Sequence, residues 1–224
     1  MSEWDDRNDA CLNAVEGALR FLRRTDDERA AVRALALRFG SPAGILEAGA
    51  HELEKTDLTA SEARLLALIP ELTRAAQRLE FGAHPKLCGA SQACEYLKTL
   101  YHGLAIEQFY ALCMDRTGRL QDCALLQKGT LNEAPFYLGA LLQKVVRTRA
   151  ECVVLSHNHP GGTLTPSQAD IDCTLAAARA LKPLGVCLLD HIIIADGSGV
   201  SMRQNGWLPA DADFAEALNA NWLR

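Results

Sequence analysis

The stretch SHNHPGGTLTPSQAD, residues 156–170, decides how the second half of this chain folds. The residues just before it, ECVVL at 151–155, form an apolar run rich in β-formers, which predicts a buried strand over 151–156. After it, alanine and leucine recur at helical spacing, which predicts a helix over 167–182. A tight Pro-Gly-Gly loop therefore joins a strand to a helix.

Two histidines and an acid of this stretch can meet at one point. Side chains two positions apart along a strand point the same way, so His157 and His159 face one side. The loop can return Asp170, in the first turn of the helix, to the same place. Two imidazoles and a carboxylate, with a fourth position left for water, are the ligand set of a catalytic zinc site.

The residue types alone also allow a plainer interpretation. Neighbouring histidines in a loop rich in glycine and proline are commonly just polar loop residues. Ser167 and Asp170, three positions apart at a helix start, are typical of an N-cap and of an acid in the favourable field of the helix dipole. Periodicity does not separate the two interpretations.

A resemblance to known proteins favours the metal site. The motif His-x-His-Pro, with Ser167 and Asp170 at their spacing from His159, resembles the JAMM motif of the MPN/JAB metalloprotease fold. The fuller string SHNHPGG…TPSQAD, followed by LDHIII at 189–194, resembles the bacterial RadC family in particular. The resemblance implies an α/β layered domain of the MPN/JAB (cytidine-deaminase-like) type with a mixed sheet. It also implies zinc held by His157, His159 and Asp170, and imidazole and carboxylate ligands in a hydrolytic setting favour that metal.

A zinc hydrolase needs a base beside the water that its metal activates. The resemblance implies Glu107, at the start of an early strand, in this role. Glu133 and Glu151 are rival acids, of which Glu133 is the less favoured alternative. Glu151 begins the predicted motif strand, roughly 20 Å from His157 at about 3.3 Å per residue, and is excluded on that ground.

Further residues around the motif have candidate roles. The resemblance implies that Ser167 donates a hydrogen bond to the oxyanion that develops in acyl transfer. Ser156 is a candidate to orient a ligand histidine from outside the ligand set. Asp190 and His191 match an Asp-His pair of the family. A histidine that leads into three isoleucines is typical of a core residue, so we do not add His191 to the ligands.

Length, composition and charge narrow the class of protein. The chain has 224 residues, 49% of them hydrophobic, enough for one or two domains with real cores. The net charge of −5 supplies no general basic field for nucleic acid or an anionic membrane. No apolar run reaches membrane-spanning length, and residues 1–7 lack the apolar core of a secretory signal. Eight scattered cysteines without a CxxC pair predict reduced thiols, so we expect a cytoplasmic protein without membrane association.

Residues 1–82 are predicted to form a small, all-helical domain. They resemble the N-terminal region of RadC proteins, which carries a helix-hairpin-helix, a motif that binds the DNA backbone through glycines at its turn. Here the corresponding turn, KTDLTAS at 55–61, has no glycine and has an acid near its middle, so the motif is degenerate. Residues 1–86 hold 12 Lys and Arg against 15 Asp and Glu, a balance that repels phosphates. DNA is therefore a disfavoured partner.

Residues 87–224 are predicted to form the RadC-like JAMM/MPN domain, after a plain linker at 82–86 that includes His84. Besides the motif elements, the expected elements are helices over 91–100 and 132–149, strands over 107–115 and 119–129 that form a hairpin, a strand over 186–195, and a hairpin turn at 196–199. The tail at 211–223 is predicted to be an amphipathic helix. Its apolar face (Phe214, Leu218 and Trp222) is expected to dock on the chain itself or on a second copy, as a homodimer.

Two functions of different classes follow. The first is a JAMM-type zinc metallopeptidase that cleaves a peptide or isopeptide bond in a peptide or protein substrate. The second is a non-catalytic or DNA-associated accessory protein, in keeping with the DNA-repair role associated with the RadC family. One departure bears on the substrate. RadC-like sequences usually carry Pro-Arg-Glu at the start of the helix before the motif strand, and this chain has Ala-Pro-Phe at 134–136, so we expect a different groove there.

Overall fold

The computed structural model describes residues 13–20, 28–129 and 134–208. The predicted tail helix and the rival acid Glu133 lie outside these ranges. The chain divides into two compact units, Met1–Ala76 and Gln77–Arg224. None of the helices within the described ranges is both long and apolar enough to cross a membrane.

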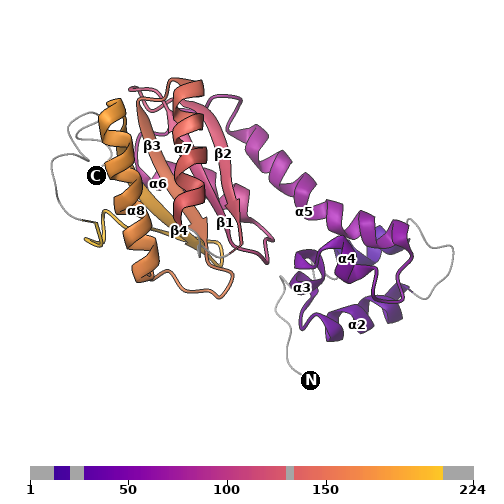
Figure 1. Cartoon of the computed structure of the whole chain (residues 1–224). Helices are drawn as coiled ribbons and strands as arrows, with labels where there is room; N and C mark the ends of the chain where they lie inside the picture. The colour runs from indigo at the N-terminus through magenta and orange to yellow at the C-terminus, as the bar shows by residue number, and fades with distance from the viewer. Residues whose placement is uncertain (1–12, 21–27, 130–133, 209–224) are drawn as a thin grey trace. The chain divides into compact units, whose positions relative to one another are not determined.

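The described residues of the first unit form helices. Residues 13–20 are helical, and the elements that follow are α2 (Glu28–Arg38), α3 (Pro42–Glu47), α4 (Ala50–Leu53) and α5 (Ala60–Glu80), as labelled in Figure 1. The helix α5 opens with a capping box. The Thr59 N–H donates to the Glu62 carboxylate at 2.7 Å, and the Glu62 N–H donates to the Thr59 hydroxyl at 3.3 Å.

The backbone amides of the turn between α4 and α5 donate hydrogen bonds to α4 and to the turn itself. The N–H groups of Lys55 and Thr56 donate to backbone carbonyls of α4, and the Leu58 N–H donates to the Thr56 hydroxyl. None of the residues of this described turn has a positive φ. A hairpin that binds DNA phosphates presents free amides at such a turn, and here three of them already have acceptors.

The second unit is built on a five-stranded mixed sheet in the order β2-β1-β3-β4-β5. The strands are β1 (Gln108–Met114), β2 (Leu120–Lys128), β3 (Cys152–Asn158), β4 (Cys187–Ala195) and β5 (Ser198–Ser201). Only β3 and β4 run parallel; the other neighbours are antiparallel. The α/β class, the mixed sheet and both hairpins expected from the sequence are confirmed.

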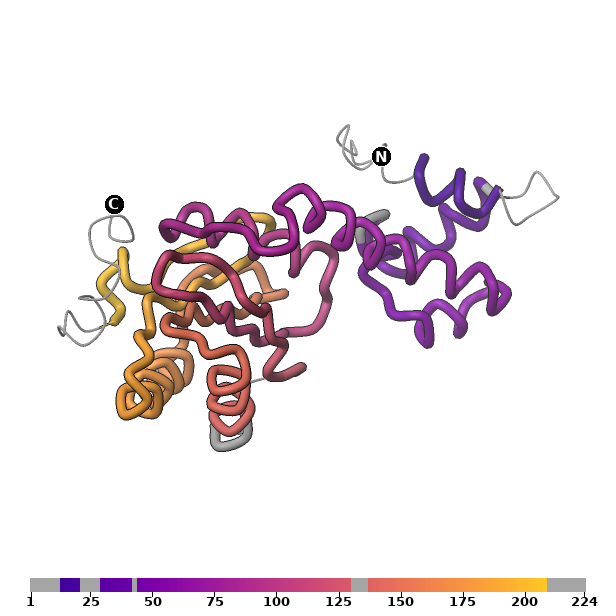
Figure 2. The backbone as a smooth tube through the Cα atoms, turned by 90° about the horizontal axis from the view of Figure 1, so that it is seen from above, coloured from indigo at the N-terminus to yellow at the C-terminus, as the bar shows by residue number. Residues whose placement is uncertain are grey.

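Helices cover both faces of this sheet. Figures 1 and 2 show α7 (Ala134–Thr148) and α8 (Gln168–Leu181) on one face and α6 (Ala90–Tyr101) on the other. The burial along β3 follows the strand period: Val153 and Leu155 pack under α7 and α8, whereas Cys152 and Val154 pack under α6. This alternation decides which residues of the motif can reach the site.

Two loops differ from the sequence expectation. The turn between β4 and β5 is only Asp196-Gly197, with φ values of 47° and 70°, because two positive-φ residues form the tight turn that suits strand twist. The segment before residue 87 is more than a plain linker. Lys86 forms a β-bridge with Arg119, and the His84 ring hydrogen-bonds the Leu120 carbonyl at 2.9 Å.

Candidate metal centre

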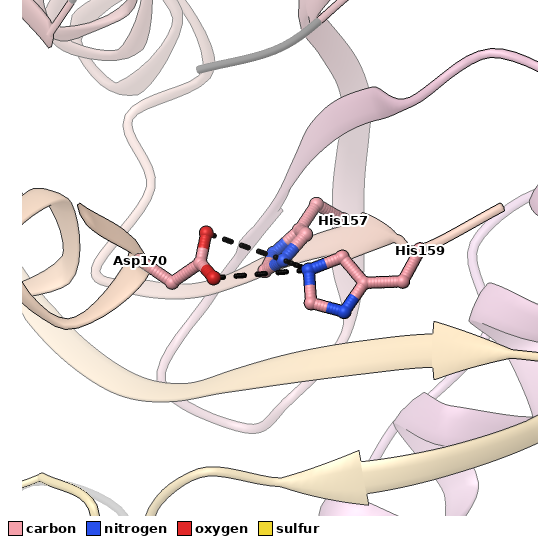
Figure 3. Close-up of side chains that lie close together, drawn as sticks. All are labelled: His157, His159 and Asp170. Atoms are coloured by element: carbon pink, nitrogen blue, oxygen red, sulfur yellow. Dashed lines mark hydrogen bonds and ion pairs between the residues drawn. The ribbon is translucent and has the colours of Figure 1, made fainter. Parts of the chain in front are cut away.

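Three side chains of the motif come together on the α7/α8 face of the sheet. The ligand atoms of His157, His159 and Asp170 lie within 4.8 Å of one another. Figure 3 shows the three side chains pointing toward one another. The two Nε2 atoms are 2.8 Å apart. Asp170 places Oδ1 at 3.3 Å from the His157 Nε2 and Oδ2 at 3.7 Å from the His159 Nε2. The structure thus brings together the three ligands expected from the sequence.

The histidines converge because β3 is longer than the sequence predicted. β4 supplies pairing partners for two more residues, so β3 ends at Asn158 instead of residue 156. His157 lies within the strand, and the His159 N–H still donates to the Ile194 carbonyl at 2.8 Å. The two rings therefore stay on one face, with centroids 4.5 Å apart.

The loop that returns the chain to Asp170 depends on Gly162. This glycine has a φ of 78°, and a Cβ there would lie 2.6 Å from the Asp196 carboxylate. Ser167 then caps α8 in a capping box with Asp170. The Ser167 N–H and hydroxyl both donate to Asp170 Oδ2 at 2.7 Å, which holds the carboxylate toward the histidines.

The electrostatics favour an ionised Asp170 beside neutral or cationic imidazoles. Burial acts to raise the pKa of Asp170, but the two histidines and Ser167 outweigh it and hold that pKa below its usual range. The neighbouring Asp170 carboxylate raises the pKa of His159. Burial lowers the pKa of His157 to about 4, so its ring is neutral and able to act as a ligand.

The donor set fits a tetrahedral zinc ion. The His159 Nδ1 lies 2.8 Å from the Thr163 carbonyl, which can only accept, so Nδ1 carries the proton and Nε2 turns a lone pair into the site. Ligand atoms at zinc distances in tetrahedral geometry are about 3.3 Å apart, close to the spacings of 2.8, 3.3 and 3.7 Å found here. Small movements of these side chains would accommodate the ion.

Glu107 lies on the same face as the three ligands. Phe109 pairs with His157 across the antiparallel β1–β3 ladder, and continuing this register by two residues sets Glu107 opposite His159. Burial is the main cause that raises the pKa of Glu107; the charge of His159 lowers it and that of Asp170 raises it, as expected for neighbouring groups. These charge effects place the Glu107 carboxylate near His159 and Asp170.

The side chain of Asn158 holds the backbone on either side of Glu107. Its Oδ1 accepts from the Gln108 N–H at 2.7 Å, and its Nδ2 donates to the Ile106 carbonyl at 3.3 Å. Asn158 is 4% exposed and points away from the ligand face. The carboxamide of Asn158, the middle residue of the His-Asn-His motif, therefore takes the place of a pair of backbone hydrogen bonds where the β1–β3 ladder ends.

Asn158→Ala is expected to lower the free energy of unfolding by about 1–3 kcal/mol, because the Gln108 N–H loses its acceptor in a nearly buried position. Urea denaturation of the metal-free proteins measures this. Asn205→Ala, which removes a carboxamide that donates to the Ser201 carbonyl outside the site, is the matched control. Equal stability of wild type and Asn158→Ala would show that the carboxamide does not hold this segment.

The other candidates take different places. Ser156 lies on the opposite face of β3, among residues packed under α6, so the structure does not bring it to the ligand histidines. Burial raises the pKa of its neighbour Tyr101 well above the usual value, against the effect of the Ser156 hydroxyl. Glu151 pairs with Arg116 just before β3, at the end away from the centre.

Two residues that the sequence did not add to the centre contact it from behind. The Nδ1 of His157 lies 2.8 Å from the Nε2 of His191, which is fully buried in β4. The other His191 nitrogen meets the hydroxyl of Thr174, one turn into α8 from Asp170. In the sequence, only the Asp-His pair pointed to His191. No pattern pointed to Thr174, because the residue that it contacts lies on another strand.

Asp190 is a structural acid on the α6 side of β4. Its carboxylate accepts from the backbone N–H of His191 and Arg203 and from the Ser201 hydroxyl. Burial nevertheless raises its pKa to about 6. A carboxyl whose folded pKa exceeds its unfolded value contributes stability at acidic pH that is lost as the pH rises.

Relative to Asp190→Asn, the wild-type free energy of unfolding is therefore expected to fall by about 2 kcal/mol between pH 4 and pH 6, because the folded pKa lies about two units above the unfolded one. Urea titrations of both metal-free proteins across this range measure the difference. A constant difference would mean that the hydrogen bonds keep the pKa of Asp190 at its ordinary value.

Comparison with known proteins agrees with these features. Residues 87–207 match the RadC-like JAB domain. A UPF0758 protein of Bordetella pertussis is 33% identical over 175 residues, which cover 78% of each chain. A UPF0758 protein of Pseudomonas fluorescens is 32% identical over 204 residues, covering 89% of this chain and 91% of its own. The chain, with its mixed sheet and its His/His/Asp group, therefore belongs to the RadC family and carries the RadC-like JAB domain.

Proposed function

We propose that this protein is a JAMM-type zinc hydrolase that cleaves a peptide or isopeptide bond. The observation that carries the proposal is that His157, His159 and Asp170 converge on the same face of the sheet as Glu107. When bound by the three ligands, zinc supplies a Lewis acid that lowers the pKa of a water towards ~7.

In this proposal the protein residues divide the chemistry between them. Glu107, at the edge of the centre and half-buried, takes the proton of the attacking water and passes it to the leaving amine. Its raised pKa makes it a better proton acceptor than an exposed glutamate. Asn158 keeps the backbone that carries Glu107 in register with β3.

Ser167 is the proposed donor to the oxyanion. Its hydroxyl now donates to Asp170 Oδ2, while it accepts from the Asp170 N–H at 3.2 Å. Donation to a substrate requires the hydroxyl to turn away from the carboxylate, whose Oδ2 keeps the backbone N–H of Ser167. N-capping and oxyanion stabilisation can then alternate in one residue.

Elemental analysis of the purified protein, followed by incubation with a peptide library read by mass spectrometry, tests the proposal. Bound zinc and new peptide ends that disappear with a chelator are expected. The accessory alternative predicts neither, and its DNA branch predicts salt-sensitive binding of a fluorescent duplex. The closed turn before α5 supports the expectation that no such binding occurs.

A further inference from the structure

A series of three hydrogen bonds lies behind the candidate metal centre. The His157 Nδ1 is 2.8 Å from the His191 Nε2, and the His191 Nδ1 contacts the Thr174 hydroxyl. That hydroxyl is also 2.6 Å from the backbone carbonyl of Asp170. The series of hydrogen bonds thus starts at the ligand His157, crosses from β3 to β4 to α8, and ends on the backbone carbonyl of the ligand Asp170.

The direction of each hydrogen bond in this series follows from the Asp170 carbonyl, the one group in it that can only accept. The carbonyl of Asp170 has no proton, so the single proton of the Thr174 hydroxyl must lie between these two oxygens. The hydroxyl therefore accepts from His191, whose Nδ1 carries the proton and whose Nε2 has a lone pair. His157 must then donate from Nδ1 to His191, which leaves its own Nε2 unprotonated.

We infer that Thr174 and His191 are positioning residues that fix the His157 tautomer and turn its Nε2 lone pair toward the metal. The carbonyl of Thr163, outside this series of hydrogen bonds, fixes the tautomer of His159 in the same way. Both imidazoles can then turn an Nε2 lone pair toward the same point, where the ion would bind. Groups outside the ligand set that set ligand tautomers typically change metal affinity 10- to 100-fold.

The neighbouring groups support donation from His157 to His191 and on to Thr174 over the reverse direction. If Thr174 donated to His191 instead, its oxygen would face the Asp170 carbonyl at 2.6 Å with no proton between them. His191 and Thr174 are both fully buried, so water cannot replace either partner.

The inference uses the metal site of the proposed function but not its catalysis, so its test reads metal affinity alone. Thr174→Val keeps the shape and removes the hydroxyl, and its zinc Kd, from competition with a chelating dye, should rise 10- to 100-fold. Thr174→Ser restores the hydroxyl and should return the Kd to within about threefold of wild type. In the metal-free protein, ¹⁵N shifts of the His157 ring should show a proton on Nδ1 in wild type and a mixture of tautomers in Thr174→Val.

Thr148→Val is the matched control, because Thr148 also donates its hydroxyl to a carbonyl four residues earlier in a helix, at 2.8 Å, away from the centre. Its zinc Kd should equal that of wild type. An unchanged Kd and tautomer in Thr174→Val would overturn the inference, as would a Thr174→Ser variant that binds zinc as weakly as Thr174→Val. If the hydrolase proposal fails but zinc binds, these measurements still show whether Thr174 and His191 position His157.

Discussion

Glu107→Gln is expected to lower hydrolytic turnover by about 10²- to 10⁴-fold, the range that a general base contributes, while leaving the zinc content unchanged. The amide keeps the size of the side chain but cannot accept the proton of the water. Glu107 is not among the grouped ligand atoms, so its charge is not needed to hold the ion. Turnover of a peptide found in the library screen, measured together with zinc content, checks both parts.

Glu151→Gln is the control for this experiment. Glu151 is a glutamate that precedes the same strand, but it bonds Arg116 at the end away from the centre. Its replacement should leave turnover unchanged. A Glu107→Gln protein as active as wild type would remove Glu107 from the mechanism, and one that loses zinc would make it a ligand instead of a base.

His159→Ala is expected to abolish the stabilisation that zinc confers on the folded protein. With zinc at a hundredfold its Kd, the wild-type free energy of unfolding should rise by about 2.7 kcal/mol. For a chain of this size that is a rise in Tm of about 5–11 °C, measured by calorimetry. Without the His159 Nε2, only two of the three grouped ligand atoms remain, and the Tm should no longer respond to zinc.

The histidine on α4 separates this effect from adventitious binding. His51 is exposed and lies in the first unit, outside the ligand group. His51→Ala should keep the full rise in Tm with zinc. A His159→Ala protein that still gains stability from zinc would show that the ion binds elsewhere in the chain. Acidification should weaken the wild-type response, because protons compete for the imidazole ligands.

The local pattern of the sequence was enough to predict most elements, and the resemblance to the RadC family then favoured the three ligands over plain loop residues. The alternation of side chains along a strand placed His157 and His159 on one face, and the spacing to the capped helix returned Asp170 to them. Local pattern also predicted the hairpin of β1 and β2, whereas the resemblance implied the α/β class. These features depend on residues near in sequence, whose geometry the backbone period and the caps dictate.

Only the tertiary structure decided what stands around that ligand set. β3 extends to Asn158 because β4 pairs with it, and this extension keeps the imidazole rings of His157 and His159 on one face. The roles of Thr174 and His191 arise where α8 and β4 meet β3, and Asn158 serves the backbone of β1. Each of these contacts joins residues far apart in the chain, and hydrogen-bond partners across a sheet follow from register and packing, which local periodicity does not encode.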